Sequence, residues 1–490
     1  MQTKKGKLVS LKLNFVLNVI RVSSTALITI FTMPYLNRVL GATNIGKVEY
    51  IYTLINYFVL FSSLGIPMYG IRETSKVRHD QKKLYTVVFE LLIILGVTTF
   101  ISYLVIFGII IHLNNFQSYK NLIYILSLMV FLNNIGAEWY FQGIEDQKFI
   151  TLRNILVRLM TVILIFMMIK TSLDYEKYSI LLVVMYFGAN LINICVLFNH
   201  ILKEKISWKS LNLKRHYKPI LTIFIATISV NIYLQLDKFL IGTIVGDKGV
   251  AYYTLAYSLL RFGILFLTAL GAVIIPRLSY LYLNDKEKYF QFLTKIFNGL
   301  LLVSIPLTIF FSIFAENIIS LMGGKEFAPS ILSLKILSPL CILFSIAYFL
   351  GFMVLYPQGE EKIYSKATVF TAVISIILNI FAIRYFNIYG ASVVAIISEF
   401  LSILFMFFLM RKKMVNIGIL NKNSRKIVLI NLFIFIVLFV IVNTFKIGFV
   451  QWISFSILGI ILYVSFLFLF HEETTVEIAS AVKSKFLKNR

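Results

Sequence analysis

Runs of about twenty apolar residues, separated by short polar connections, fill the chain from end to end. Each run is near the length that crosses the hydrocarbon core of a bilayer as a helix. The pattern predicts an all-α polytopic membrane protein with about fourteen transmembrane helices. The expected spans are residues 13–36, 49–69, 85–111, 122–142, 154–171, 179–199, 219–241, 251–275, 297–322, 332–355, 367–384, 391–410, 427–445 and 450–470.

The first span is apolar on most faces but polar along one narrow stripe. Arg21 lies in its middle, and a guanidinium at bilayer depth costs from a few to more than ten kcal/mol if it faces lipid. The stripe is therefore predicted to face a bundle interior or a wet cavity, which makes that interior cationic. Its members fall on one line at about 100° per residue: Asn14, Asn18, Arg21, Thr25, Thr29 and Thr32.

The seventh span repeats this pattern. Thr227, Asn231, Gln235 and Lys238 fall within roughly a quarter of the helix circumference. Asp237 adjoins Lys238 and has two interpretations. It is a proton or sodium site, since carboxylates at membrane depth are usually kept for function, or it forms a local ion pair with Lys238.

Two more arginines lie inside predicted spans. Arg261 is in the middle of span eight and is predicted to line a cavity, because it is too deep to reach the interface easily. Arg158 lies about one turn inside span five. It either extends to the interface or pairs with Glu138 or Glu90, and pairing is the favoured interpretation.

Glu399 in span twelve shares a helix face with Ser392 and Ser402. It is either a second carboxylate for ion coupling or a contact between packed helices. The sequence does not separate these two readings.

Composition agrees with a membrane protein. Hydrophobic residues make up 59% of the chain and charged residues only 14%, against roughly a quarter charged in soluble domains. The net charge of +25 would suggest nucleic acid in a soluble protein. Here the basic residues gather in alternate connections, so we expect no nucleic acid partner and place both termini in the cytoplasm.

A short internal repeat suggests two lobes. Residues 35–41 (YLNRVLG) resemble residues 235–242 (QLDKFLIG), and residues 46–50 (GKVEY) resemble residues 249–253 (GVAYY). The offset is six predicted spans, so the two copies have the same membrane orientation, as in transporters with parallel repeats. We predict an N-lobe at residues 1–205, a C-lobe at 206–415, and two further spans with a basic tail at 416–490.

Soluble-enzyme motifs are not supported. Residues 41–47 (GATNIGK) resemble a phosphate-binding loop, but Val48 occupies the position of the magnesium-binding hydroxyl. The histidines and cysteines show no metal-ligand spacing. We therefore expect no enzymatic activity, no metal and no cofactor.

Residues 138–153 (EWYFQGIEDQKFITLR) resemble the polysaccharide transporter family of O-antigen and capsule repeat-unit flippases. That family belongs to the MOP superfamily, with the MATE drug exporters and the lipid II flippase. Supporting stretches extend over nearly the whole chain: residues 236–238 (LDK), 276–279 (PRLS), 323–330 (GGKEFAPS), 357–362 (PQGEEK) and 389–392 (YGAS).

The resemblance implies a two-lobed flippase of the bacterial cytoplasmic membrane. Its substrate would be an undecaprenyl-pyrophosphate-linked oligosaccharide, moved by alternating access for O-antigen, capsule or exopolysaccharide biosynthesis. Membrane lipids, a glycan polymerase and other assembly proteins are the further partners implied. Coupling to an H⁺ or Na⁺ gradient is a separate hypothesis that rests on the carboxylates Asp237 and Glu399, and the sequence does not decide whether transport is coupled.

Site residues follow from this reading. Arginine pairs phosphate oxygens bidentately, so Arg21 and Arg261 are expected to hold the head group, and Asn and Thr neighbours to bond sugar hydroxyls. The head-group set is Arg21, Arg261, Asn18, Thr25, Asn231, Gln235, Lys238 and Arg158. The coupling or gating set is Asp237, Glu399 and Glu138.

Two alternatives remain. A MATE-type cation-coupled drug antiporter should expose acidic groups in its cavity, and Arg21 and Arg261 argue against it. A membrane glycan polymerase or ligase should need a sizeable external loop or a convergent catalytic set, and the predicted outer connections are short.

Overall fold

The computed structural model describes residues 11–201, 211–411, 421–444, 448–472 and 475, and these residues are helical without a strand. Ten of the helical segments they form are long and apolar enough to cross a membrane. Two of the ten, Leu27–Val77 and Glu361–Met410, are about twice the length of one crossing. The predicted all-α polytopic membrane protein is confirmed, whereas the count of fourteen spans stays a prediction.

The chain divides into two compact units, residues 1–251 and 252–490, and each is described by itself. The predicted lobe boundaries at 205 and 415 lie outside the described residues and stay predictions. The predicted basic tail from 476 onward also lies outside them.

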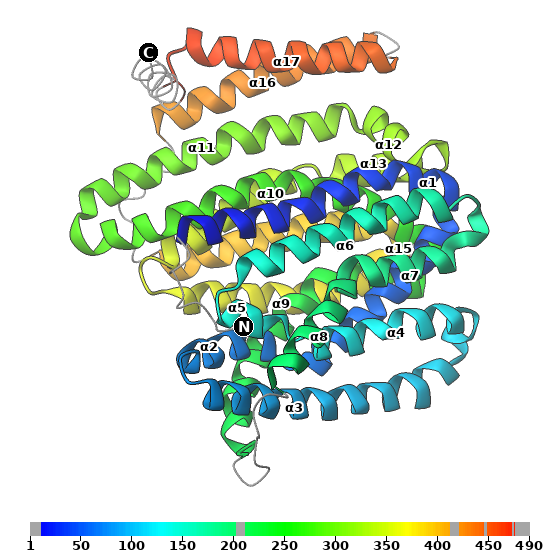
Figure 1. Ribbon diagram of the computed structural model, residues 1–490. Helices are drawn as coiled ribbons and strands as arrows, with labels where there is room; N and C mark the ends of the chain where they lie inside the picture. Colours follow the sequence, from blue (N-terminus) through cyan, green and yellow to red (C-terminus); the bar gives the residue numbers. More distant parts are fainter. Residues whose placement is uncertain (1–10, 202–210, 412–420, 445–447, 473–474, 476–490) are drawn as a thin grey trace, which may run out of the picture. The chain divides into compact units, whose positions relative to one another are not determined.

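The first unit contains the helices up to α9 and the first residues of α10 (Figure 1). Its longest helix, α1, is interrupted at Gly41, where φ is 73°, a conformation that glycine adopts without steric cost. Gly246, with φ 99°, separates α9 from α10. The first copy of the internal repeat therefore ends at the glycine that breaks α1, and the second copy ends four residues before Gly246. The helices of this unit are α1 (Leu11–Ser63), α2 (Ile66–Val77), α3 (Gln81–Gly108), η1 (Ile110–His112), η2 (Asn114–Tyr119), α4 (Lys120–Ile135), α5 (Glu138–Gly143), α6 (Gln147–Met168), η3 (Ser172–Asp174), α7 (Tyr175–Val183), η4 (Val184–Gly188), α8 (Ala189–Ile201) and α9 (Lys214–Ile244).

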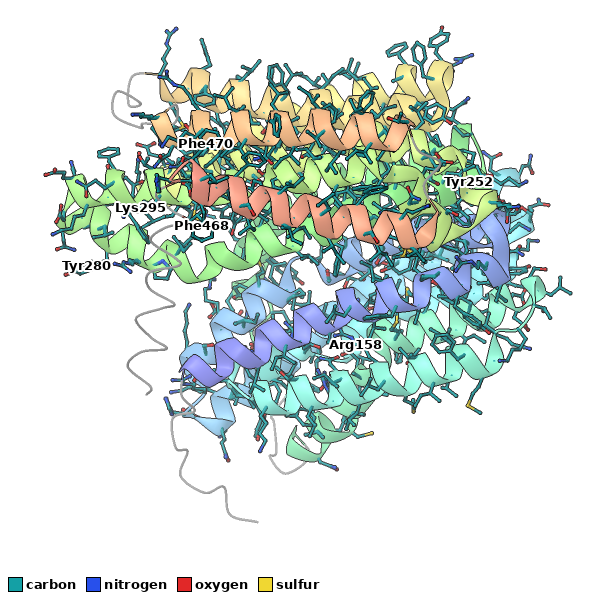
Figure 2. All side chains as sticks on the ribbon, turned by 90° about the horizontal axis from the view of Figure 1, so that it is seen from above. Arg158, Tyr252, Tyr280, Lys295, Phe468 and Phe470 are labelled. Atoms are coloured by element: carbon teal, nitrogen blue, oxygen red, sulfur yellow. The ribbon has the colours of Figure 1, made fainter. Side chains whose placement is uncertain are left out.

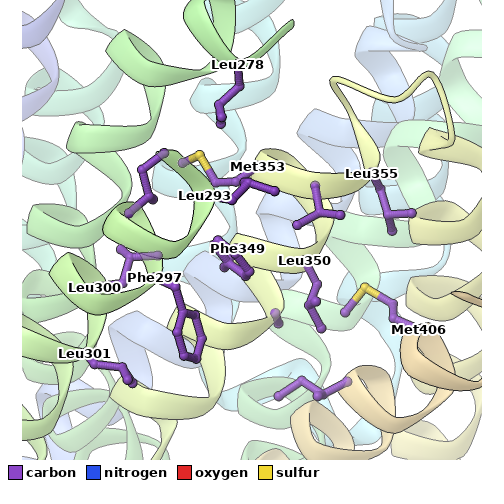
Figure 3. Packing of buried hydrophobic residues seen from close by; sticks show 14 of the residues in the cluster. Leu278, Leu293, Phe297, Leu300, Leu301, Phe349, Leu350, Met353, Leu355 and Met406 are labelled. Atoms are coloured by element: carbon purple, nitrogen blue, oxygen red, sulfur yellow. The ribbon is translucent and has the colours of Figure 1, made fainter. Parts of the chain in front are cut away.

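The second unit begins inside α10 and includes α15, which bends at Asn387 with φ 54°. Helices α16 and α17 lie side by side (Figure 1). The core forms where η7, a π-helix, packs with α11 and α15, and Phe349, Leu350 and Met353 point into it (Figure 3). The helices of this unit are α10 (Asp247–Asn284), α11 (Lys286–Ile313), α12 (Ala315–Gly323), η6 (Lys325–Phe327), α13 (Pro329–Leu337), α14 (Leu340–Tyr348), η7 (Phe349–Leu355), α15 (Glu361–Met410), α16 (Lys422–Thr444) and α17 (Phe449–Leu469).

Candidate functional site

Glu138 joins two arginines inside the first unit. Arg21 Nη1 on α1 lies 2.9 Å from Glu138 Oε1, and Arg153 Nη2 on α6 lies 2.9 Å from Glu138 Oε2. Gln142 Nε2 also donates to Glu138 Oε1, at 3.1 Å. One carboxylate therefore faces two guanidinium groups, which leaves a net positive charge at this point.

The short helix α5 places Glu138 at this point. Ala137 adopts a left-handed conformation with φ 42°, which turns the chain from α4 into α5. Asp146 then caps α6 by accepting a hydrogen bond from the Phe149 amide. The two turns hold Glu138 and Arg153 on consecutive helices that face each other.

Arg153 is the buried member of this group, with a side chain only 4% exposed. Its Nη1 donates to the Ala189 carbonyl at 3.3 Å. Its guanidinium also lies over the rings of Phe141 and Phe149, at 5.9 and 5.3 Å from their centroids. Sequence analysis did not select Arg153 as a site residue, although it ends the stretch that carries the family resemblance.

Arg158 forms hydrogen bonds to α1 in place of the ion pair that the sequence predicts. Its Nη1 donates to the Arg21 carbonyl at 2.8 Å and to Ser24 Oγ at 3.0 Å. The expected pairing with Glu138 or Glu90 is therefore wrong, because both carboxylates bind other cations. Arg158 is buried among the helices of the first unit, where Figure 2 marks it, and it ties α6 to the first span beside Arg21.

A second ion pair joins α1 to α9. Lys238 Nζ lies 3.1 Å from Glu49 Oε2, and both side chains are less than one fifth exposed. Sequence analysis missed Glu49, although it lies in the repeated stretch at residues 46–50. Asp237 is half-buried on α9 beside this pair, and neither of its interpretations is tested by this contact.

The structure describes only some of the other polar residues on the stripes of predicted spans one and seven. Gln235 is half-buried on α9. The side chains of Asn18, Thr25 and Asn231 lie outside the described part of the structure, so their expected place in a cavity stays a prediction.

Glu90 forms a third buried group, although the sequence indicated Glu90 only as a candidate partner of Arg158. Its carboxylate binds Arg215 and accepts the Asn212 amide at 2.6 Å. His216 Nε2 lies 2.8 Å from Glu90 Oε2, and its Nδ1 lies 2.7 Å from Tyr69 Oη. These contacts tie the start of α9 to α2 and α3. The partners lie more than 120 residues from Glu90 along the chain, so no local pattern indicates them.

In the second unit, two charged side chains stand apart from this pattern of pairing. Arg261 is exposed near the middle of the apolar part of α10 and makes no ion pair or hydrogen bond with another described residue. Glu399 on α15 is half-buried and likewise makes no ion pair or hydrogen bond with another described residue. Within the first unit, by contrast, Glu49, Glu90 and Glu138 each bind a cation.

The two charged side chains of the second unit that make no ion pair within the described chain, Arg261 and Glu399, can bind a ligand. Among the described residues, no group of three or more His, Cys, Asp or Glu side chains could hold a metal ion. The Arg261 guanidinium can bind an anion, since it carries five hydrogen-bond donors in a planar fork. The Glu399 carboxylate can accept hydrogen bonds from hydroxyl groups, or it can take up a proton.

The chain matches known families along most of its length. Residues 11–282 match the family described as polysaccharide biosynthesis protein, and residues 222–381 match the MatE family. A putative O-antigen transporter of Escherichia coli (strain K12) is 22% identical over 400 residues, which cover 81% of this chain and 96% of that protein. A probable low-salt glycan biosynthesis flippase of Haloferax volcanii is 26% identical over 175 residues, 36% of this chain and 37% of that protein.

Solved structures resemble the fold. The lipid II flippase MurJ in an inward closed conformation superposes with a TM-score of 0.71 at 16% identity, over 93% of this chain and 98% of that one. An inward-facing multidrug resistance MATE family transporter gives 0.62 at 15% identity, over 81% and 97%. Since the polysaccharide biosynthesis match spans more than half of the chain, this membrane protein belongs to the polysaccharide biosynthesis protein family.

Proposed function

We propose that this protein is a flippase that moves a lipid-linked oligosaccharide across the bacterial cytoplasmic membrane. The substrate is an undecaprenyl-pyrophosphate-linked repeat unit, used for O-antigen, capsule or exopolysaccharide synthesis. Family membership supports this proposal, as do the names of the similar proteins, a putative O-antigen transporter and a probable glycan flippase.

The observation that carries the proposal is the unpaired Arg261. A cation near the middle of an apolar helix is expensive unless it meets an anion or water. Arg261 is exposed and has no acidic partner in the described chain. A pyrophosphate supplies the matching charge, and arginine can bind its oxygens bidentately.

Arg21 differs from Arg261 because it already has a carboxylate partner. Glu138 already neutralises it, so a pyrophosphate must compete with that carboxylate. Because Glu138 also binds Arg153, it can keep one arginine while the substrate binds the other. Within the first unit, Arg21 is then a conditional contact for the head group.

Transport proceeds by alternating access between the two lobes, with both termini in the cytoplasm. An H⁺ or Na⁺ gradient supplies the driving force, and Asp237 and Glu399 are the candidate coupling carboxylates. A glycan polymerase and other assembly proteins are the partners that would receive the flipped repeat unit.

The decisive experiment uses a strain that lacks the gene. Its lipid-linked oligosaccharides are extracted and analysed by mass spectrometry, and its surface polysaccharide is measured. Completed repeat units that accumulate on the cytoplasmic side, with loss of surface glycan, support the flippase. Single repeat units that reach the outer face unpolymerised would instead point to a polymerase or ligase.

A cation-coupled drug antiporter is the second candidate, because residues 222–381 match the MatE family. Such a protein should extrude cationic drugs, and its loss should leave the lipid-linked pool unchanged. Drug accumulation assays in the same deletion strain separate the two candidates.

A further inference from the structure

Four aromatic side chains form a row along α14, η7 and the residue that follows. Phe344, Tyr348, Phe352 and Tyr356 are spaced four residues apart. Successive ring centroids are 6.1, 5.0 and 5.7 Å apart, with interplanar angles of 12°, 34° and 17°. We name these four residues the aromatic row.

The π-helix keeps the row on one face. In a regular α-helix, residues four apart drift by about 40° around the axis. The wider turn of η7, in which the Tyr356 amide donates to the Gly351 carbonyl at 3.0 Å, counters this drift. Such π-helical turns occur frequently at functional sites.

The two faces of this helix differ. Phe349, Leu350 and Met353 are buried in the core of the second unit (Figure 3). The members of the row remain partly exposed, and Tyr356 is half exposed. Tyr348 packs against this core, whereas the row as a whole keeps a partly exposed face that is available for contact.

Polar groups lie next to part of the row, at Tyr348 and Phe352, which argues against a face that meets only lipid. Tyr348 Oη donates to the Thr268 carbonyl at 3.3 Å. The Tyr364 ring lies 5.2 Å from the Phe352 ring, and the Glu399 carboxylate is close enough to Tyr364 to act on it electrostatically. Gly351 permits this arrangement, since a Cβ there would lie 2.6 Å from the Tyr364 ring.

We propose that the aromatic row, with Tyr364 and Glu399, binds the sugar rings of the transported oligosaccharide. The C–H face of a pyranose is apolar and rests well on an aromatic face, while its hydroxyls need polar partners. Tyrosine hydroxyls and a carboxylate without a partner supply them. Glu399 is then a sugar contact in addition to its candidate role in coupling, and it is not a helix-packing residue. This inference rests on the proposed function.

The position of the row agrees with this role. It runs from the middle of predicted span ten to its end at residue 355, where the connection is predicted to be cytoplasmic. Arg261 lies on α10 seven residues before Thr268, the contact of Tyr348, which is about 10 Å along a helix. One helix thus carries both the unpaired guanidinium and a contact of the row.

The test measures sugar binding separately from lipid binding. Full-length protein in lipid nanodiscs is titrated with the oligosaccharide that mild acid releases from the lipid-linked pool of the deletion strain. It is also titrated with undecaprenyl pyrophosphate that carries no sugar. The variants are Phe352→Leu, Tyr356→Leu and Glu399→Gln. The control is Phe439→Leu, which removes an exposed aromatic side chain stacked on Phe435 in α16.

We expect Phe352→Leu, Tyr356→Leu and Glu399→Gln each to weaken oligosaccharide binding roughly threefold to tenfold and to leave binding of the sugar-free lipid unchanged. Phe439→Leu should change neither affinity. Unchanged oligosaccharide binding in folded Phe352→Leu and Tyr356→Leu would overturn the proposal. Tyr356 lies at an exposed helix end, so Tyr356→Leu remains informative if Phe352→Leu fails to fold.

Failure of the proposed function gives a different result. If the deletion strain accumulates no lipid-linked oligosaccharide, the flippase assignment fails and the aromatic row loses its ligand. If the strain does accumulate it and the row variants bind it normally, only the row proposal fails.

Discussion

Arg21 and Glu138 form an ion pair at 2.9 Å across 117 residues of sequence. The charge that makes the first span unusual is therefore matched by the residue that begins the family-like stretch at 138–153. Glu138 also binds Arg153, so the two arginines depend on one carboxylate.

Glu138→Gln should destabilise the protein strongly. It leaves Arg21 and the almost fully buried Arg153 without a counter-charge. The loss should be on the order of 3 kcal/mol, because removing one partner strands a buried cation. Thermal unfolding in one detergent measures it. Glu145→Gln, which breaks the more exposed pair with Arg78, should cost less than about 1 kcal/mol, and equal losses would contradict this account.

Arg21→Ala should abolish transport without a comparable loss of protein. The Glu138–Arg153 pair survives this substitution, so membrane abundance should stay near that of the wild type. The measurement is complementation of the deletion strain, read as surface polysaccharide. Normal surface glycan in this variant would remove Arg21 from the mechanism.

Arg261→Ala should reduce flipping by at least about tenfold, the effect of losing a charged hydrogen bond to phosphate. Abundance should not change, because the side chain is exposed and makes no ion pair in the described chain. Arg261→Lys should recover part of the activity, since lysine keeps the charge but loses the bidentate geometry. Arg384→Ala, at another exposed arginine in the same unit, serves as the control and should transport normally.

Gly46→Ala and Gly299→Ala should have opposite effects on stability. A Cβ at Gly46 would lie 1.8 Å from the Asp247 carbonyl oxygen, and backbone cannot move aside cheaply. The expected cost is about 2 kcal/mol or more. At Gly299, inside α11, a Cβ meets nothing within 4 Å, so alanine should stabilise by about 0.5–1 kcal/mol. Thermal unfolding of both variants checks the sign, and a harmless Gly46→Ala would refute the close approach.

Asp285 should stabilise the start of α11 only above acidic pH. It accepts the Lys288 amide at 3.1 Å and pairs with the Lys288 ammonium at 2.7 Å. These contacts hold the pKa of the Asp285 carboxyl below its ordinary value of 3.8. Because the folded pKa lies below the ordinary value, the stability that Asp285 contributes is fully present above the ordinary value. It is lost as pH falls through the folded pKa. The protection of the Lys288 amide against hydrogen exchange, measured relative to its intrinsic exchange rate at each pH, should fall below about pH 4 in the wild type. In Asp285→Ala this protection should be low at every pH, and a wild-type profile in that variant would contradict the prediction.

Sequence alone determined the class of the molecule. Long apolar runs, few charges and basic residues in alternate connections predict membrane helices, because a bilayer demands internal backbone hydrogen bonding and excludes charge. The same argument selected Arg21, Arg158, Lys238, Arg261 and Glu399 as unusual, since a charge inside an apolar run is visible without a structure. The stretch at residues 138–153 indicated the family that the chain proved to match.

Tertiary structure decided which of these charges are neutralised. Glu138 binds Arg21 and Arg153, Glu49 binds Lys238, and the cluster around Glu90 involves residues more than 120 positions away. Helical periodicity gives the face of each residue but not the helix that covers it, so the expected partner of Arg158 was wrong. The π-helix that aligns the aromatic row is likewise set by packing. Periodicity reports one helix at a time, whereas pairing and burial depend on how separate helices meet.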